Sequence, residues 1–397
     1  MTGNRTAMIS FFRAKISKNE HLQSLNSLRS ILKDEEIGDW SRAVELTTVL
    51  DDVCKAFDKD VKSLETYEEC IFPDMNNATA TTADTVEYLR EWHVIGNAPS
   101  LPAMMAVSCG VFGIESPDHV QTLLMAGVLG EVENDLPYHN NMHFKKVALQ
   151  TMRMIAVHND IFEGTARAFG PKEITMLLAA ACIHDLDHDG LGNMIKGNFY
   201  QGRLERRAHE IVVPYFRATG MDEESLTLLK SMLLATDVSP LGSVTNPLHQ
   251  MKSAYRRHYK GEKGLHNTLH LDEELEIFEL NPMAAQMACL LQEADIATSG
   301  GLDYTVTQYE TVQIYTEIKL YGARPSHVLD FLDKVCQRCF LTDAGQRLFG
   351  ANMARICALA EEDYANGDEP FPKAQHTDFI LGTSANKSCK TDPARLN

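Results

Sequence analysis

Apolar residues in the middle of the chain recur with the period of an α-helix. In residues 171–183 the apolar positions lie three or four residues apart, at Ile174, Leu177, Leu178, Ala181 and Cys182. Residues 283–297 repeat this spacing at Met287, Leu290, Leu291 and Ala294. Such spacing gathers apolar side chains on one face of a helix. Alternating runs of Val, Ile and Thr, which would indicate strands, are nearly absent. The predicted fold class is therefore all-α, a compact body of many helices.

The two ends of the chain have a different pattern. The N-terminal part mixes charged helical pieces with a polar run at 76–82 that reads as a linker, and few apolar residues follow position 372. We therefore expect three parts: an N-terminal helical extension or linker at 1–83, a helical domain at 84–365 and a flexible tail at 366–397.

Composition and charge exclude several classes of protein. The 37 basic residues against 55 acidic ones leave a net charge of −18, which argues against a protein that binds nucleic acid or an anionic membrane. The longest apolar run, 176–183, is far shorter than the roughly 20 residues of a transmembrane helix. The basic cluster at 256–260 lies in a Pro- and Gly-containing segment, 239–272, which we predict to be a solvated surface loop.

Cysteine usage bears on the compartment. The nine cysteines are scattered without a repeating spacing, and no secretory signal opens the sequence. Both features favour a reducing environment, so the expected location is cytoplasmic. Oligomeric state stays open, with a homodimer among the possibilities.

Candidate chemistry is concentrated in two short segments rich in His and Asp. His139 and His143 are four residues apart, which places both imidazoles on one face of a helix. His184, Asp185 and His188 follow directly after the apolar stripe of 171–183. Burying that many ionisable groups without partners would cost several kcal/mol each. A divalent metal is the simplest partner that satisfies them together.

The alternative interpretation is that each of these is an ordinary satisfied or exposed polar residue. For a lone histidine that interpretation would be preferred, but it does not explain a His-Asp pair at a helix end with a further His one turn on. An upstream His and a later Asp on an apolar helix would complete the ligand set of a metal-dependent phosphohydrolase. Asp295, between Ala294 and Ile296, fits that later position best.

At these motifs the sequence resembles the class I 3′,5′-cyclic nucleotide phosphodiesterases, and in particular their protozoan members. The resemblance covers roughly residues 84–362. The matching motifs are Leu89-Arg90-Glu91-Trp92-His93, Tyr138-His139-Asn140-x-x-His143, His184-Asp185 with His188-x-Gly190, Leu234-Ala235-Thr236-Asp237, and Ala294-Asp295. Several ordered motifs at familiar spacing make the match specific.

The resemblance implies an activity, its cofactors and its residues. Implied is the hydrolysis of cAMP, cGMP or both to 5′-monophosphates by a hydroxide that bridges two metals in a central pocket. The implied ligands of a tight zinc site are His143, His184, Asp185 and Asp295. Asp185 would also bind a second ion, Mg²⁺ or Mn²⁺. His139 would protonate the departing O3′ as general acid, and His188 and Glu205 would orient metal-bound waters.

The purine end of the site is implied by residues with less specific motifs. Gln337 and Phe340 have the i, i+3 relation, on a predicted helix, of the glutamine and phenylalanine that hold the purine in this family. A rival alignment would place His327 at the glutamine position. The remaining substrate contacts that the resemblance implies are Tyr138, Ile296 and Thr298. Thr298 stands where cAMP-selective members often have asparagine, so the nucleotide preference stays open.

Two other functions share part of this pattern. A His-Asp phosphohydrolase acting on noncyclic nucleotides would use the same metal ligands, but it gives no reason for Tyr138-His139-Asn140 or for Gln337 with Phe340. A catalytically silent sensor of cyclic nucleotides would have no need of an intact general acid and metal site. In every case the expected partner is a small nucleotide and not a nucleic acid.

Overall fold

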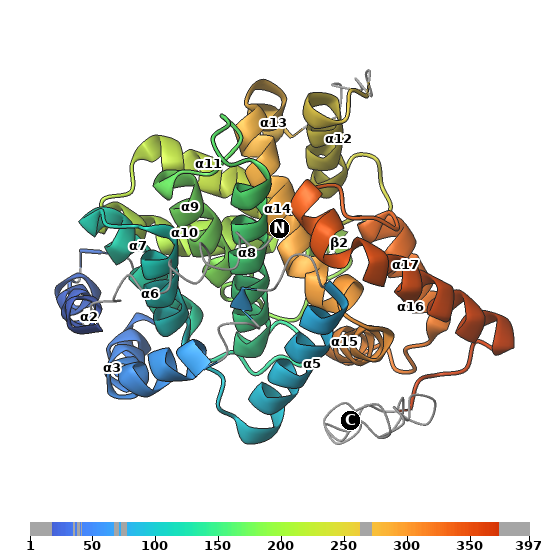
Figure 1. Ribbon diagram of the computed structural model, residues 1–397, viewed down its shortest axis with the longest axis horizontal. Coiled ribbons are helices and arrows are strands. Elements are labelled where there is room, and N and C mark those ends of the chain that lie inside the picture. The colour runs from blue at the N-terminus through green and yellow to red at the C-terminus, as the bar shows by residue number, and fades with distance from the viewer. Residues whose placement is uncertain are drawn as a thin grey trace, which may run out of the picture.

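The structure is a computed structural model that describes residues 18–34, 36–37, 40, 42–66, 71–72, 78–262 and 272–372. Its helices confirm the predicted all-α class (Figure 1). In chain order the helices are α2 (Lys18–Leu32), α3 (Ala43–Thr66), α5 (Ala78–Ile95), α6 (Leu101–Phe112), α7 (Pro117–Gly130), α8 (Asn141–Ile161), α9 (Pro171–Ile183), α10 (Arg203–Ala218), α11 (Glu223–Leu234), α12 (Pro247–Tyr259), η2 (Glu273–Leu275), α13 (Glu276–Leu280), α14 (Pro282–Gly301), α15 (Tyr304–Glu317), α16 (Pro325–Phe331), the π-helical turn η3 (Leu332–Cys336) and α17 (Asp343–Asn366).

Three helices form the centre of the molecule. α8 packs against both α9 and α14, and α14 also contacts α15 and α17. Figure 1 shows α8 and α14 side by side in the middle, with α2 and α3 at one edge and α17 at the other. α9 and α14 are buried along nearly their whole length, because other helices cover them on several sides. Three of the predicted motifs therefore lie on or directly beside largely buried helices.

Local sequence explains where the central helices begin. Asn140 caps α8, and its side chain accepts hydrogen bonds from the backbone N–H groups of Met142 and His143. α9 starts at Pro171, whose fixed φ suits the first helical position. Asn281 caps α14 in the same way as Asn140 caps α8. The predicted helices at 171–183 and 283–297 are confirmed, the second extending to Gly301.

Other expectations need correction. The segment 239–272 is not a loop throughout, since α12 lies within it and carries most of the basic cluster. α5 begins at Ala78 and not near Asp84, so the polar run before Asp84 is largely helical and the helix crosses the expected domain boundary. The division into three parts stays a prediction, and most of the expected tail, from 373 on, lies outside the described residues.

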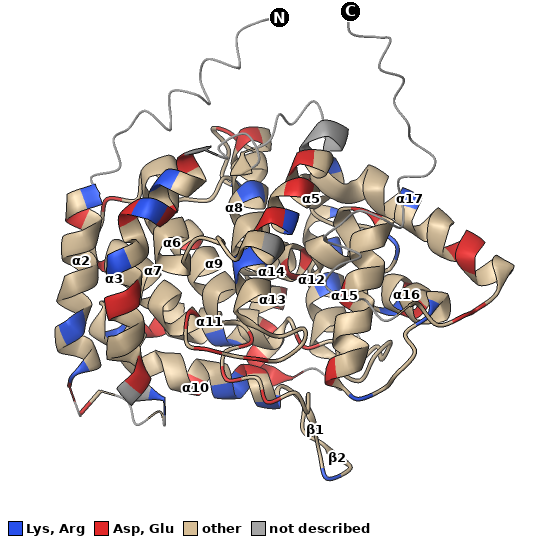
Figure 2. Cartoon of the chain, turned by 90° about the horizontal axis from the view of Figure 1, so that it is seen from below, with Lys and Arg blue, Asp and Glu red and all other residues tan. Residues whose placement is uncertain are grey.

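Strand structure in the described part of the chain is confined to one short antiparallel pair, β1 (Met194–Ile195) with β2 (Asn198–Phe199). Figure 2 shows this hairpin projecting from the body beside α10. It occupies the connection between His188 and Glu205. None of the helices described is long and apolar enough to cross a membrane.

Candidate active site

The His and Asp residues predicted from three separate motifs converge at one place. His143 is in the first turn of α8, His184 and Asp185 follow the last residue of α9, and Asp295 lies in the middle of α14. The Nε2 atoms of His143 and His184 are 3.1 Å apart. The packing of α8, α9 and α14 therefore brings together side chains that are up to 152 positions apart in sequence.

The carboxylates close the same cluster. Asp295 Oδ1 lies 3.2 Å from His143 Nε2 and 3.6 Å from His184 Nε2. Asp185 Oδ2 lies 3.4 Å and 3.1 Å from the same two nitrogens. Two ligands of a tetrahedral zinc ion, each about 2.05 Å from the metal, are roughly 3.3 Å apart. The observed separations match that spacing for His143, His184 and Asp295, which form a group close enough to hold an ion with mixed nitrogen and oxygen ligands. Asp185 lies at the same spacing from the two histidines but is not part of that group.

Hydrogen bonding prepares His184 for such a role. Its Nδ1 lies 3.2 Å from the carbonyl oxygen of Ala181, to which it donates when protonated. That bond fixes the ring so that Nε2 points at the cluster, where it can bind an ion once it is deprotonated. A ligand histidine held through its other nitrogen by a carbonyl is the usual arrangement at metal sites.

Charge in the cluster is maintained in spite of burial. Burial alone would raise the pKa of Asp185, but the positive charges of His184 and His139 outweigh it and hold the pKa well below its usual range. Burial also opposes ionisation of Asp295, yet hydrogen bonds from His143 and His184 lower its pKa to about 2. Both carboxylates therefore stay ionised, as metal ligands must be.

His139 lies beside this cluster and is held by Glu317, the last residue of α15. The ring Nδ1 is 2.6 Å from Glu317 Oε1, while Glu317 Oε2 accepts the backbone N–H groups of Tyr138 and His139. The other ring nitrogen, Nε2, is 3.9 Å from Asp185 Oδ2. Burial would lower the pKa of His139, but the charges of Asp185 and Glu317 outweigh it and raise the pKa above the ordinary value. The raised pKa favours the protonated imidazole, whose Nε2 lies on the side of Asp185.

His188 stacks on His139, with ring centroids 3.9 Å apart and planes inclined by 23°. Its Nδ1 accepts a hydrogen bond from the N–H of Gly190, and burial followed by the charge of His139 lowers its pKa to about 4. His139, His188 and Glu317 also form a group close enough to hold an ion. Two nearly parallel stacked rings cannot both direct in-plane lone pairs at one ion, so this group is better described as a hydrogen-bonded acid.

Glu205 lies in the first turn of α10, in a buried acidic setting. Its carboxyl accepts from Asn193 Nδ2 at 3.3 Å. Asp237 accepts the backbone N–H groups of Gly202 and Ser239 nearby. Burial, and then the charge of Asp237, raise the pKa of Glu205 to about 8. A cation in the cluster would favour the ionised form of Glu205 instead.

Three of the expected substrate contacts lie along the same region. Tyr138 packs its ring 4.9 Å from that of His143, and its hydroxyl is 3.3 Å from Ser299 Oγ on α14. Thr298 is one helical turn beyond Asp295 on α14, and its buried hydroxyl has no hydrogen-bond partner among the described residues. Ile296 is buried on the same helix.

Gln337 and Phe340 do not have the expected helical relation. Gln337 ends the turn η3 with a left-handed backbone (φ 56°), so the i, i+3 geometry of a helix is lost. Its side-chain oxygen accepts a hydrogen bond from Arg256 of α12. Phe340 is buried with its ring 5.2 Å from Phe349 of α17. No described contact joins either residue to the metal cluster.

The rival residue, His327, is no better placed. It stacks on Tyr315 of α15 with centroids 4.2 Å apart. Tyr315 is two residues from Glu317, so the two side chains point roughly 160° apart on the helix. His327 therefore lies on the side of α15 away from His139.

Glu317 was not singled out from the sequence. One local signal was present: an acidic residue at a helix C-terminus is unfavourable with the helix dipole, which suggests that a specific partner holds it there. That partner, His139, is 178 positions away. No short motif links residues at that separation.

Comparison with known proteins gives a match in the part of the chain that holds most of these residues. Residues 138–202 match the sequence model of the 3′5′-cyclic nucleotide phosphodiesterase family. The match spans 65 of the 397 residues, so this segment of the chain is similar to that family. The matched phosphodiesterase segment holds His139, His188 and three of the four expected metal ligands, whereas Asp295 and Glu317 lie outside it.

Among solved structures, one similar chain is the phosphodiesterase domain of the RhoPDE fusion protein from the choanoflagellate Salpingoeca rosetta. It is 14% identical, with a TM-score of 0.45, over 73% of this chain and 92% of that chain. No curated protein matches the sequence.

Proposed function

We propose that this protein hydrolyses 3′,5′-cyclic nucleotides, cAMP or cGMP or both, to 5′-monophosphates, with His139 as the general acid. The observation that carries the proposal is the position of His139. Its Nε2 lies 3.9 Å from Asp185 Oδ2, beside a group of His143, His184 and Asp295 that is close enough to hold an ion, while Glu317 holds its Nδ1 at 2.6 Å. A cyclic nucleotide needs both parts, because its phosphorus must be polarised and its alkoxide leaving group must receive a proton.

The proposed metal ligands are His143, His184, Asp185 and Asp295, with zinc as the tightly held ion. Asp185 is proposed also to bind a second ion, Mg²⁺ or Mn²⁺. When bound, such ions act as Lewis acids toward a phosphoryl oxygen and lower the pKa of water. The chain itself contributes two carboxylates whose lowered pKa values keep them ionised.

The proton for the leaving group comes from His139 in this proposal. Glu317 accepts from Nδ1–H and stabilises the imidazolium, so Nε2–H is the proton available to O3′. After transfer the neutral imidazole still donates through Nδ1 to Glu317, and its ring does not turn. His188, stacked on the ring, and Glu205 are proposed to orient water at the centre.

The substrate contacts are proposed to be Tyr138, Ile296 and Thr298, with Gln337 and Phe340 at the purine. Support is stronger for the first three, since Tyr138 contacts His143 and the other two share α14 with Asp295. For Gln337 to reach a base, its hydrogen bond with Arg256 has to be exchanged. Thr298 leaves the choice between adenine and guanine to experiment.

The first test measures hydrolysis of cAMP and cGMP side by side on one preparation, with and without a chelator. Chelator-sensitive production of 5′-monophosphate is expected, and the ratio of the two rates gives the nucleotide preference. Turnover of noncyclic nucleotides at comparable rates would point to the broader His-Asp phosphohydrolase. Nucleotide binding without turnover by the metal-loaded protein would point to a sensor.

A further inference from the structure

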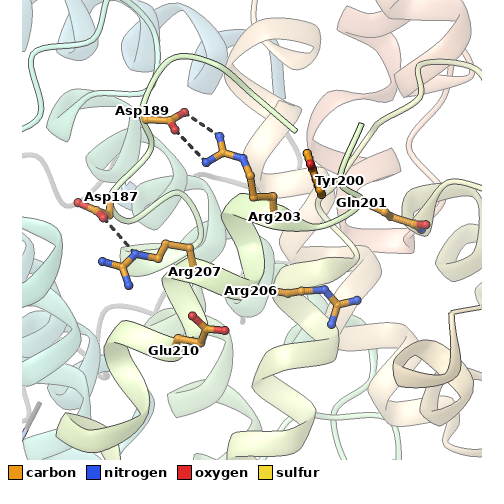
Figure 3. Close-up of a pocket in the computed structure, with 8 residues that line it drawn as sticks. All are labelled: Asp187, Asp189, Tyr200, Gln201, Arg203, Arg206, Arg207 and Glu210. Carbon is orange, nitrogen blue, oxygen red and sulfur yellow. Dashed lines mark hydrogen bonds and ion pairs between the residues drawn. The ribbon is translucent and has the colours of Figure 1, made fainter. Parts of the chain in front are cut away.

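The turn that carries His188 is held on both sides by arginines of α10. Asp187 and Asp189 flank His188, and each forms an ion pair with that helix: Asp189 with Arg203 and Asp187 with Arg207 (Figure 3). Figure 3 shows the side chain of Arg206 directed away from this turn. Arg206 bonds instead to Asp272. Of the three arginines at the start of α10, Arg203 and Arg207 therefore contact the turn around His188.

Arg203 makes the more specific of the two contacts. Its Nη1 and Nη2 each donate to a different carboxylate oxygen of Asp189 at 2.8 Å, the forked geometry that only arginine provides. Its Nε also donates to the carbonyl oxygen of Gly192 at 3.2 Å. One side chain therefore fixes both Asp189 and the backbone at the start of the hairpin.

The backbone of this turn needs such support. Asp187 has φ 62°, in the left-handed region that non-glycine residues seldom adopt. Its carboxylate lies 3.4 Å from Arg207 Nε and 3.6 Å from Arg42 Nε. Arg42 comes from the N-terminal part of the chain and also donates to the carbonyl oxygen of Glu133. Because His188 is the next residue, the conformation at Asp187 sets the direction of the backbone at His188.

These ion pairs contribute little to global stability. Asp187, Asp189, Arg203 and Arg207 line an open cavity of about 650 Å³. Water screens ion pairs of this kind, so each adds little to the free energy of unfolding. Their effect is therefore expected on the geometry of the turn and not on folding.

We propose that Arg203 is a positioning residue for catalysis. Through Asp189, and with Arg207 acting in parallel on Asp187, it keeps the ring of His188 stacked on His139, the proposed general acid. The inference rests on the proposed function. The bonds of Arg203 to Asp189 and Gly192 would also hold the connection between His188 and Glu205 against α10.

The test compares Arg203→Ala with Arg217→Ala on the same helix. Arg217 makes a similar forked pair, with Glu223 at 2.7 and 3.1 Å, but touches nothing in the site. For Arg203→Ala we expect kcat on the preferred cyclic nucleotide to fall about tenfold, because small displacements of catalytic groups are costly. KM and Tm should stay close to those of Arg217→Ala. The kcat of Arg203→Lys should lie between those of Arg203→Ala and the wild type, since lysine keeps the charge but cannot make the forked pair.

Three outcomes would count against the inference. Equal kcat values for Arg203→Ala and Arg217→Ala would overturn it and leave the proposed function intact. If kcat and Tm both fall and KM rises in Arg203→Ala but not in Arg217→Ala, the role of Arg203 is only structural. A metal-loaded wild type without any hydrolysis would overturn the proposed function, and this inference with it.

Discussion

At the scale of single residues, the chemistry depends on which partner each histidine has. His139 and His188 are stacked on each other, yet the pKa of His139 is raised and that of His188 is lowered to about 4. At His139 the charges of Asp185 and Glu317 outweigh burial, whereas at His188 burial and the charge of His139 prevail. Glu317 lies 2.6 Å from His139 Nδ1 but 3.6 Å from His188 Nδ1. One histidine is thereby prepared to donate a proton and the other to remain neutral.

Replacing His139 by Asn should lower kcat on a cyclic nucleotide by about 10²–10⁴, the usual contribution of a general acid. The loss on a nitrophenyl phosphodiester should be much smaller, because nitrophenolate departs without a proton. Steady-state rates on both substrates check this. His209→Asn, which alters a histidine bonded to Leu226 of α11, serves as the control. Equal losses on the two substrates would argue against the acid role.

A histidine outside the site gives a prediction about pH and stability. His158 is buried, stacked on Phe169 and bonded to the carbonyl oxygen of Arg167. Burial lowers its pKa to about 4, so the folded chain binds fewer protons than the unfolded chain between pH 4 and 6.5. Stability is lost as pH falls through that window, by about 2 kcal/mol between pH 7 and 5. Urea unfolding at both pH values should show a smaller decline for His158→Gln, and identical declines would contradict it.

At the scale of helices, α8 and α15 are joined by a buried ion pair close to the site. Lys146 Nζ lies 2.6 Å from Glu310 Oε1, and their side chains are 6% and 4% exposed. Lys146 is one turn after His143, and Glu310 is two turns before Glu317, so each shares a helix face with a site residue. The pair therefore sets how the helix of the metal ligand meets the helix that holds the acid.

Lys146→Met should destabilise the fold by about 3–5 kcal/mol, because it leaves the Glu310 carboxylate buried without a partner. The double variant Lys146→Met/Glu310→Leu should recover most of that loss, since it buries no lone charge. Urea unfolding of the two variants and the wild type measures the difference. Lys55→Met, which breaks the exposed pair with Asp52, should leave the free energy of unfolding nearly unchanged, because water screens such a pair. A double variant as unstable as the single one would show that the charge is not the cause.

At the scale of the whole molecule, the proposed metal site joins helices that are distant in sequence. Its ligands come from α8, from the end of α9 and from α14, so an ion there links the three central helices. The N-terminal helices α2 and α3 pack outside this centre, on α7 and α6. A bound ion should therefore stabilise the fold as well as permit catalysis.

Removing the metal should abolish hydrolysis and lower Tm, because an ion that binds only the folded state stabilises it by mass action. Calorimetry and activity before and after chelation, with re-addition of Zn²⁺ and Mg²⁺, test this. In Asp295→Asn, with one ligand weakened, chelation should change Tm much less than in the wild type. An equal shift in both proteins would place the stabilising ion elsewhere.

Much of the fold and of the site was predictable because its signals are local. The helix at 171–183 follows from apolar spacing and a starting proline, and α8 begins at a capping asparagine that also lies in the His139–His143 motif. His184, Asp185 and His188 are neighbours in sequence, so their shared chemistry was visible before any packing was known. Asp295 required only that the later acid lie on an apolar helix.

The rest was decided by tertiary packing. Glu317 is useful only because α15 ends beside the start of α8, and the ion pairs of Arg203 and Lys146 depend likewise on how separate elements meet. Gln337 shows the opposite case, since a local helical pattern was overridden and η3 ended at that residue in a left-handed turn. Periodicity and capping act within a few residues of the chain. Which group pairs with a buried charge depends on how all the helices pack together, and no local sequence pattern encodes that packing.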